Sequence, residues 1–151
     1  MKFRLVLFLV LILGGGDLLA THNRFGDITY EYAGNSNAPQ RYKVTIRTCT
    51  KTSSPADRPV LEIQWGDGTI DSLPRDQIII MGADVQQNVY VGFHNYPGPG
   101  TYIMRVFDAN RNQGIINIPG SVNEPLCIET QLVISPFLTP NNSVVLEECP
   151  C

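Results

Sequence analysis

Two turn sequences with strand-like residues on both sides constrain most strongly what this chain can fold into. The first is Trp65–Thr69 (WGDGT) and the second is His94–Tyr102 (HNYPGPGTY). Gly66 and Gly68 accept the positive φ of a tight turn, and Asp67 between them can accept a hydrogen bond from the backbone two residues on. Prolines and glycines alternate in the second turn: the prolines restrict the backbone at the corner, and the final glycine lets the chain enter the next strand. Both turns predict strands joined by tight corners.

Apolar and polar residues alternate in several segments, as expected for half-buried strands. The segments are 28–32, 42–48, 61–65, 89–93, 102–106 and 126–134. No segment carries the 3.6-residue apolar stripe of a long helix, and the 11 prolines and 13 glycines also argue against long helices. We therefore predict an all-β antiparallel sandwich, in which each strand buries one face against a second sheet. In segment 89–93, the alternation assigns Val89, Val91 and Phe93 to the core.

The first 20 residues have the layout of a secretory signal peptide. A short basic start, Met1–Arg4, precedes the unbroken apolar run 5–13, and a triple glycine and then Ala20 follow. The apolar run is too short to span a bilayer, which needs about 20 residues. We expect export to the cell surface or the medium, with no transmembrane segment in the mature chain. The net charge of −3 gives no electrostatic reason to expect a nucleic-acid partner.

With these two corners the chain resembles a PKD (polycystic kidney disease)-type domain, an immunoglobulin-like β-sandwich. More narrowly, it resembles the N-terminal module of large gliding-motility-associated surface proteins of Bacteroidetes-type bacteria. The matching stretches are 21–24 with Gly26 and 28–30, 51–58, 65–68, 96–102, 110–112 with 114–115, and 140–143. The resemblance implies a non-catalytic structural or adhesive module, whose partners are neighbouring modules, other surface proteins or glycans.

The resemblance also bears on domain organisation. We expect a signal peptide at 1–20, a sandwich at 21–135, and an exit linker with the truncated start of a following module at 136–151. The similar proteins continue into further modules and a C-terminal sorting domain. A truly truncated chain would therefore be delivered to the periplasm only.

Tyr102 stands where a sandwich of this kind has its tyrosine corner, with the hydroxyl bonded back to the preceding loop. Met104 stands where an antibody domain has its second core cysteine, so we expect a core without a central disulfide, packed around Trp65 and Met104. The residues expected to determine the fold are Trp65, Gly66, Asp67, Gly68, Tyr96, Gly100 and Tyr102.

Secretion permits disulfides, and the chain has four cysteines. Cys49 and Cys127 fall on the predicted polar faces of their strands, at places where tyrosine is expected in the similar proteins. If those strands are adjacent, a bridge between them would close a loop of nearly 80 residues and stabilise the fold by roughly 3–4 kcal/mol. The alternative is two independent thiols. Cys149 and Cys151 are too close together for an easy bridge, and a lone Cys-x-Cys pair matches a zinc site poorly.

Two groups of oxygen-bearing residues also suggest chemistry. Asp108, Asn110 and Asn112 place oxygens at alternate positions, as in a calcium loop, but the glycine and acidic positions of such a loop are not matched, and an Asx-rich turn between strands is the simpler interpretation. Asp67 and Asp71, with Glu62 nearby, could form a carboxylate pair, but no neighbouring nucleophile completes a catalytic arrangement.

His94 is expected to bond a loop carbonyl, and His22 would lie near the mature N-terminus. Tyr90 and Phe107 are expected on outer strand faces, where aromatic rings can bind sugars or partner proteins. The sequence thus favours a non-enzymatic module, with a carbohydrate- or calcium-binding accessory module as the alternative.

Overall fold

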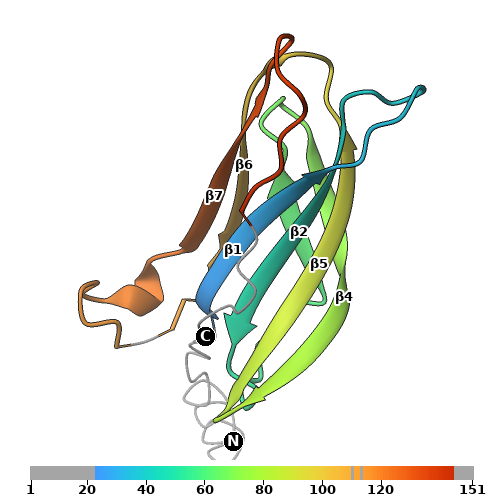
Figure 1. The fold of residues 1–151 in the computed structure, drawn as a ribbon. Coiled ribbons are helices and arrows are strands. Elements are labelled where there is room, and N and C mark those ends of the chain that lie inside the picture. Colours follow the sequence, from blue (N-terminus) through green and yellow to red (C-terminus); the bar gives the residue numbers. More distant parts are fainter. Residues whose placement is uncertain (1–22, 110, 113, 145–151) are drawn as a thin grey trace, which may run out of the picture.

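The computed structural model describes residues 23–109, 111–112 and 114–144 (Figure 1). These residues form an all-β, antiparallel fold, as predicted, with one turn of 3-10 helix, η1 (Ser121–Asn123). The strands are β1 (Asn23–Tyr32), β2 (Arg41–Thr50), β3 (Val60–Gln64), β4 (Ile70–Gly82), β5 (Val85–Asn95), β6 (Gly100–Asp108) and β7 (Leu126–Ile134). The predicted signal peptide, His22, Asn110, Cys149 and Cys151 lie outside the described residues.

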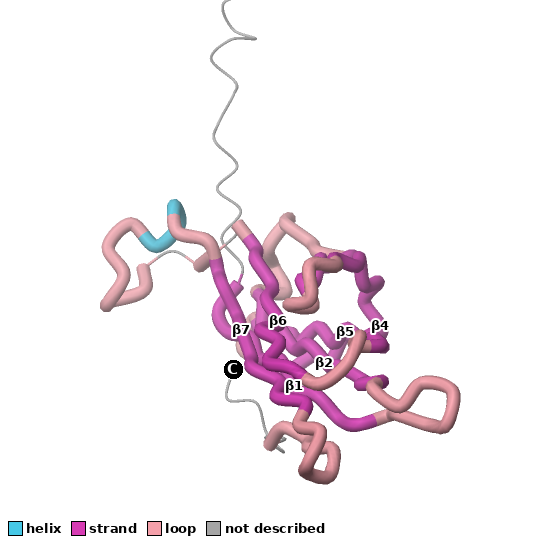
Figure 2. Tube along the Cα trace, turned by 90° about the horizontal axis from the view of Figure 1, so that it is seen from above, coloured by secondary structure: helices cyan, strands magenta, loops and turns pink. Residues whose placement is uncertain are grey.

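One continuous sheet contains the seven strands in the order β1-β2-β5-β4-β3-β6-β7. The sheet folds over at β4, because residues 70–74 of this strand pair with β3 whereas residues 75–82 pair with β5. Strands β1, β2 and β5 therefore lie in one layer, and β3, β6 and β7 in a facing layer (Figure 2). The two end strands, β1 and β7, lie in contact, which closes the fold around its interior.

Strand β4 was not among the alternating segments. Its apolar residues do not alternate with polar ones, because the run Ile78–Met81 is continuous and Pro74 interrupts the strand. Ile78, Ile80 and Met81 are all about half exposed or more, so this strand has no single buried face to impose a period of two. Pro74 is tolerated where the strand passes from one pairing partner to the other.

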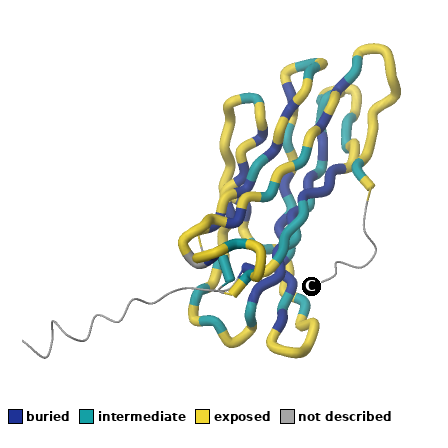
Figure 3. The backbone as a smooth tube through the Cα atoms, turned by 90° about the vertical axis from the view of Figure 1, so that its left-hand side faces the viewer, coloured by how far each residue is buried: buried dark blue, intermediate teal, exposed yellow. Residues whose placement is uncertain are grey.

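The core lies between the two layers and runs the length of the molecule (Figure 3). Its largest fully buried side chains are Trp65, Tyr42 and Tyr90, with Met104 packed among them, so the expectation for Trp65 and Met104 is confirmed. Strand β2 shows how the sequence builds this core: its side chains alternate between partly and fully buried from Arg41 to Arg47. Full burial of each such apolar side chain contributes about 1.5–3 kcal/mol.

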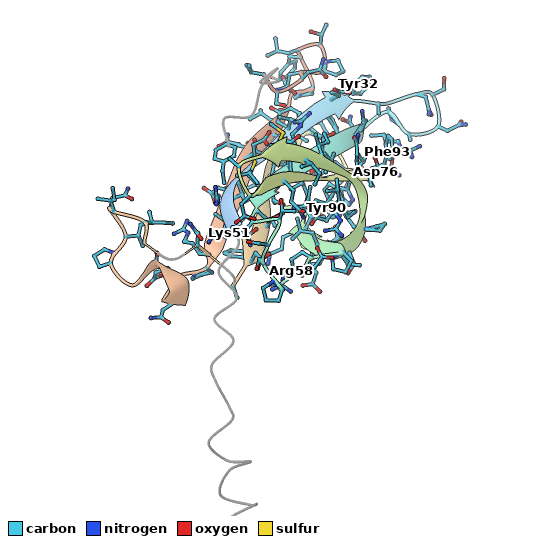
Figure 4. All side chains as sticks on the ribbon, turned by 90° about the horizontal axis from the view of Figure 1, so that it is seen from below. Tyr32, Lys51, Arg58, Asp76, Tyr90 and Phe93 are labelled. Atoms are coloured by element: carbon cyan, nitrogen blue, oxygen red, sulfur yellow. The ribbon has the colours of Figure 1, made fainter. Side chains whose placement is uncertain are left out.

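Strand β5 contradicts the predicted inward face. Tyr90 is fully buried, not exposed, whereas Phe93 is 51% exposed and Val89 is only partly covered (Figure 4). Two features select this face. The hydroxyl of Tyr90 donates to the carbonyl of Arg58 at 2.7 Å, which satisfies its polar end inside the fold. Gly92, on the same face, leaves room for the indole of Trp65.

The segment expected to be an exit linker folds back onto β1. The backbone N–H of Ser143 donates to the carbonyl of Tyr30 at 2.9 Å, and the Ser143 hydroxyl accepts from the N–H of Tyr30 at 2.7 Å. The Asn142 side-chain oxygen accepts from the N–H of Tyr32 at 2.7 Å. Residues 142 and 143 therefore satisfy backbone groups along the free edge of β1 and belong to the same folded unit.

Candidate functional site

The two predicted corners meet at one end of the fold. In the first corner, Gly66 and Gly68 have φ of 88° and 94°, and Asp67 Oδ1 accepts hydrogen bonds from the backbone N–H and the hydroxyl of Thr69 at 3.0 and 2.6 Å. A Cβ built on Gly66 would lie 2.5 Å from the backbone nitrogen of Ile103. Gly66 is therefore required both for its conformation and for the close approach of the turn to β6.

His94 brings the second corner onto the first. Its Nε2 lies 2.7 Å from Asp67 Oδ2, and its ring stacks on Trp65 with centroids 4.6 Å apart and an interplanar angle of 9°. The expectation that His94 bonds a loop carbonyl is wrong, because the partner is this carboxylate. The Trp65 Nε1–H donates to Asp71 Oδ2 at 2.7 Å. Both carboxylates considered as a catalytic pair are therefore engaged in holding the tryptophan and histidine rings.

The carboxyl group of Asp67 is strongly acidic in this setting. Burial alone would raise its pKa, but hydrogen bonds from Thr69 and His94, together with the charge of His94, outweigh burial and lower the pKa from 3.8 to about 2. Asp67 therefore remains an anion over the whole physiological range. Its hydrogen bonds hold it in the turn. The Thr69 hydroxyl donates its proton to the Asp67 carboxylate, whereas a nucleophilic hydroxyl would donate to an imidazole base.

Two tyrosines complete this cluster. The Tyr96 hydroxyl donates to the carbonyl of Trp65 at 3.2 Å, and burial raises the pKa of Tyr96 above its ordinary value. The Tyr102 hydroxyl donates to the carbonyl of Gly98 at 2.8 Å, which confirms the expected bond back to the loop. A Cβ on Gly100 would lie 3.2 Å from that hydroxyl, so the loop passes close to the ring. We call Trp65, Asp67, His94, Tyr96 and Tyr102 the corner cluster.

A second polar group lies in the half of the fold away from the corner cluster. The guanidinium of Arg58 holds the Asp108 carboxylate with Nε and Nη2 at 3.0–3.2 Å, and Tyr90 donates to the Arg58 carbonyl. Arg75 bonds Asn88 at 3.1 Å and pairs with Asp57. Burial raises the pKa of Tyr90, so its hydroxyl stays a donor.

The contact between Arg58 and Asp108 argues against the calcium site considered at Asp108. Its carboxylate is 5% exposed and faces an arginine rather than an open loop. Asn110 lies outside the described residues, and the backbone of Asn112 donates to the carbonyl of Asn23 at 2.9 Å. Within the described part of the chain, no group of three or more His, Cys, Asp or Glu residues is arranged to hold a metal ion.

Neither alternative considered for Cys49 and Cys127, a bridge between them or two independent thiols, is found. Cys127 is a free and exposed thiol on β7, whereas Cys49 on β2 is fully buried and already disulfide-bonded. The strands are not neighbours: β7 pairs with β6, with Cys127 opposite Phe107, and β2 pairs with β1 and β5. The burial of Cys49 follows from the end of β2, where alternation stops and three successive residues are buried.

The largest hollow among those described lies on the outer side of the second layer. Its volume is about 710 Å³, and its lining includes Arg58, Val60, Glu62 and Phe107. Phe107 is 50% exposed, as predicted, but Tyr90 is not its partner on the surface. Arg58 and Val60 were missed by the sequence reasoning, because nothing in the pattern showed that β3 begins beside the end of β6.

Comparison with protein-family models, with curated proteins and with solved structures finds no match to this chain. In the described residues, no helix is long and apolar enough to cross a membrane. The candidate sites therefore have to be interpreted from their own geometry.

Proposed function

We propose that this chain is a non-catalytic, structural or adhesive module of a secreted or cell-surface protein, with an immunoglobulin-like, PKD-type sandwich fold. The observation that carries the proposal is the corner cluster. The two sequence corners that resemble the PKD type converge on one stacked Trp65–His94 pair, and the carboxylate, imidazole and hydroxyl groups there bond to one another or to the backbone. Such a cluster stiffens a module and leaves its surfaces for contact.

Two further features support an exported, surface-associated protein. Cys49 is disulfide-bonded, and disulfides persist mainly in oxidising compartments. The sequence of the first 20 residues is that of a signal peptide. The gliding-motility-associated proteins of the sequence resemblance are likewise surface proteins.

Export is tested by expressing the full chain in a Gram-negative host and fractionating the cells. We expect a periplasmic protein that begins at Thr21, with Cys49 oxidised. Leu9→Arg, which breaks the apolar run, should leave the chain unprocessed in the cytoplasm. Cytoplasmic accumulation of the unaltered chain would contradict the proposal.

The adhesive role is tested with beads coated with the purified protein. Folded protein should promote attachment of the beads to bacterial cell surfaces, whereas the same protein carrying Trp65→Ala, which removes the centre of the corner cluster, should not. Equal attachment by both coatings would show that adhesion does not depend on the fold.

A carbohydrate-binding function is less well supported than contact with protein. A sugar chain is held best by at least two exposed aromatic rings on one concave face, and Tyr90, which was expected on an outer face like Phe107, is buried inside the fold. Phe93, the other half-exposed phenylalanine, lies on β5 in the opposite layer, with the Arg41 guanidinium 4.8 Å from its ring centre.

A further inference from the structure

Strands β3 and β6 are neighbours in the sheet, yet in the described residues they pair at one position, Gln64 with Arg105. On its other side, β3 pairs with β4 from Val60 to Gln64, and β6 pairs with β7 along its whole length. Continuing the antiparallel register would set Glu62 opposite Phe107, but that pair is not formed. The two strands therefore part toward the start of β3, and the main-chain groups that face the gap have no ladder partner there.

The large hollow lies at this parting. Val60 and Glu62 line it from β3, Phe107 lines it from β6, and Ala109 and Pro125 close its end. A smaller hollow continues along the strands, shares Glu62 and Phe107, and adds Gln64, Ile70 and Arg105. We call the two together the β3–β6 groove.

The groove has fixed walls and one uncompensated charge. The Arg58 guanidinium is held by Asp108, and Arg105 pairs with Glu129 at 2.9 Å, so both cations are neutralised. Glu62 is exposed and makes no ion pair with any described residue. A ligand that complements the groove therefore carries a positive charge near Glu62.

The apolar part of the groove is also open. Phe107 is 50% exposed and Val60 is 48% exposed. One ring is a poor platform for a sugar chain, which gains from stacking on several. It suits one apolar side chain of a peptide, whose neighbours in an extended conformation point the other way.

We propose that the β3–β6 groove binds an extended polypeptide segment, supplied by another surface protein, that carries a lysine or arginine two residues from an apolar residue. The main chain of the segment hydrogen-bonds to the parted strands, its apolar side chain packs on Phe107, and its cation pairs with Glu62. Such strand addition gives affinity through the main chain and specificity through alternate side chains. The inference rests on the proposed function, because it names the partner of that contact module.

The test uses the purified ¹⁵N-labelled protein and three synthetic probes, followed by backbone amide shifts. The probes are a capped hexapeptide that places one valine and one lysine two residues apart among threonines, the same peptide with glutamate in place of lysine, and the lysine peptide with alternate N-methylated amides. We expect the lysine peptide to shift amides in 60–63 and 105–109, and to bind at least tenfold more tightly than the other two. Equal binding of the N-methylated peptide would overturn the main-chain contact.

Substitutions distinguish binding in the groove from nonspecific binding to exposed aromatic rings. Phe107→Ala and Glu62→Gln should each weaken the lysine peptide by about tenfold, whereas Phe93→Ala, which removes an equally exposed ring from the other layer, should leave binding unchanged. Equal loss in Phe93→Ala, shifts confined to other strands, no shifts at millimolar peptide, or shifts caused instead by cello- or chito-oligosaccharides would each overturn the proposal. Correct export and fold-dependent bead attachment would still leave the module function standing.

Discussion

Gly92 on β5 lies directly beneath the indole of Trp65: a Cβ built on Gly92 would be 3.1 Å from Trp65 Cη2 and 2.9 Å from both methyl carbons of Leu73. The neighbouring core side chains occupy the space that a side chain at position 92 would need. Gly92→Ala should therefore destabilise the protein by about 1–3 kcal/mol through overpacking. Denaturant unfolding measures the loss, and Gly98→Ala is the matched control, because a Cβ there meets nothing within 4 Å. Equal stability of the two variants would contradict the packing described.

The sequence was sufficient for the all-β antiparallel fold and for the local turns that contribute to the corner cluster. Turn chemistry is local, so Gly66, Asp67 and Gly68 could be interpreted as a tight turn. The bond from the Tyr102 hydroxyl to its loop could also be expected, because Tyr102 follows that loop directly in the sequence. Partners that depend on which layers face each other could not be read in this way. The contact between His94 and Asp67 joins two corners across the fold, and nothing in either corner alone specifies it.

The errors have a common physical origin, because hydrophobicity was used to choose the buried face of each strand. In β5 the valines and Phe93 are more apolar than the face that is buried, but Tyr90 finds an acceptor inside and Gly92 makes room for a neighbour. Cys49 was assigned to a polar face by parity, which fails where β2 ends. The parting of β3 and β6 depends on strand geometry and has no counterpart in the residue pattern.

The low pKa of Asp67 predicts an acid-sensitive part of the stability. The pKa of Asp67 is about 2 in the folded protein and 3.8 as the unperturbed value, so its contribution is fully present above pH 4 and is lost as the pH falls toward 2. The shift corresponds to roughly 2 kcal/mol. Asp67→Asn should be less stable at pH 7 and should lose less stability than the unaltered protein between pH 4 and pH 2.

The measurement is the free energy of unfolding in urea at several pH values. Asp76→Asn provides the control, since Asp76 is an exposed carboxylate on β4, outside the corner cluster. If Asp67→Asn follows the same pH profile as the unaltered protein, the carboxylate does not make the hydrogen bonds described.

The cysteines should differ sharply in reactivity. The exposed Cys127 thiol should react with a maleimide in the native oxidised protein, whereas Cys49 should react only after reduction and unfolding. Cys127→Ser should leave stability nearly unchanged, and Cys49→Ser should cost roughly 2–4 kcal/mol. Mass spectrometry of the unreduced digest should find Cys49 in a disulfide-linked peptide and Cys127 as a free thiol. A peptide linking Cys49 to Cys127 would refute the assignment.

The contact of Ser143 with β1 makes the last prediction. The Ser143 hydroxyl accepts from the Tyr30 N–H and donates to the Tyr30 carbonyl, at 2.7 and 3.2 Å, so it acts as a strand partner on an otherwise open edge. Ser143→Ala should lower stability by about 1 kcal/mol, the usual net value of such a bond, and should speed hydrogen exchange at the Tyr30 amide. Thr139→Ala, in an exposed part of the same segment, should change neither.

An open β1 edge is also a template for pairing between chains, so a chain ending at residue 140 should self-associate in sedimentation experiments. A monomeric truncated chain with unchanged exchange at Tyr30 would show that the returning segment does not protect this edge.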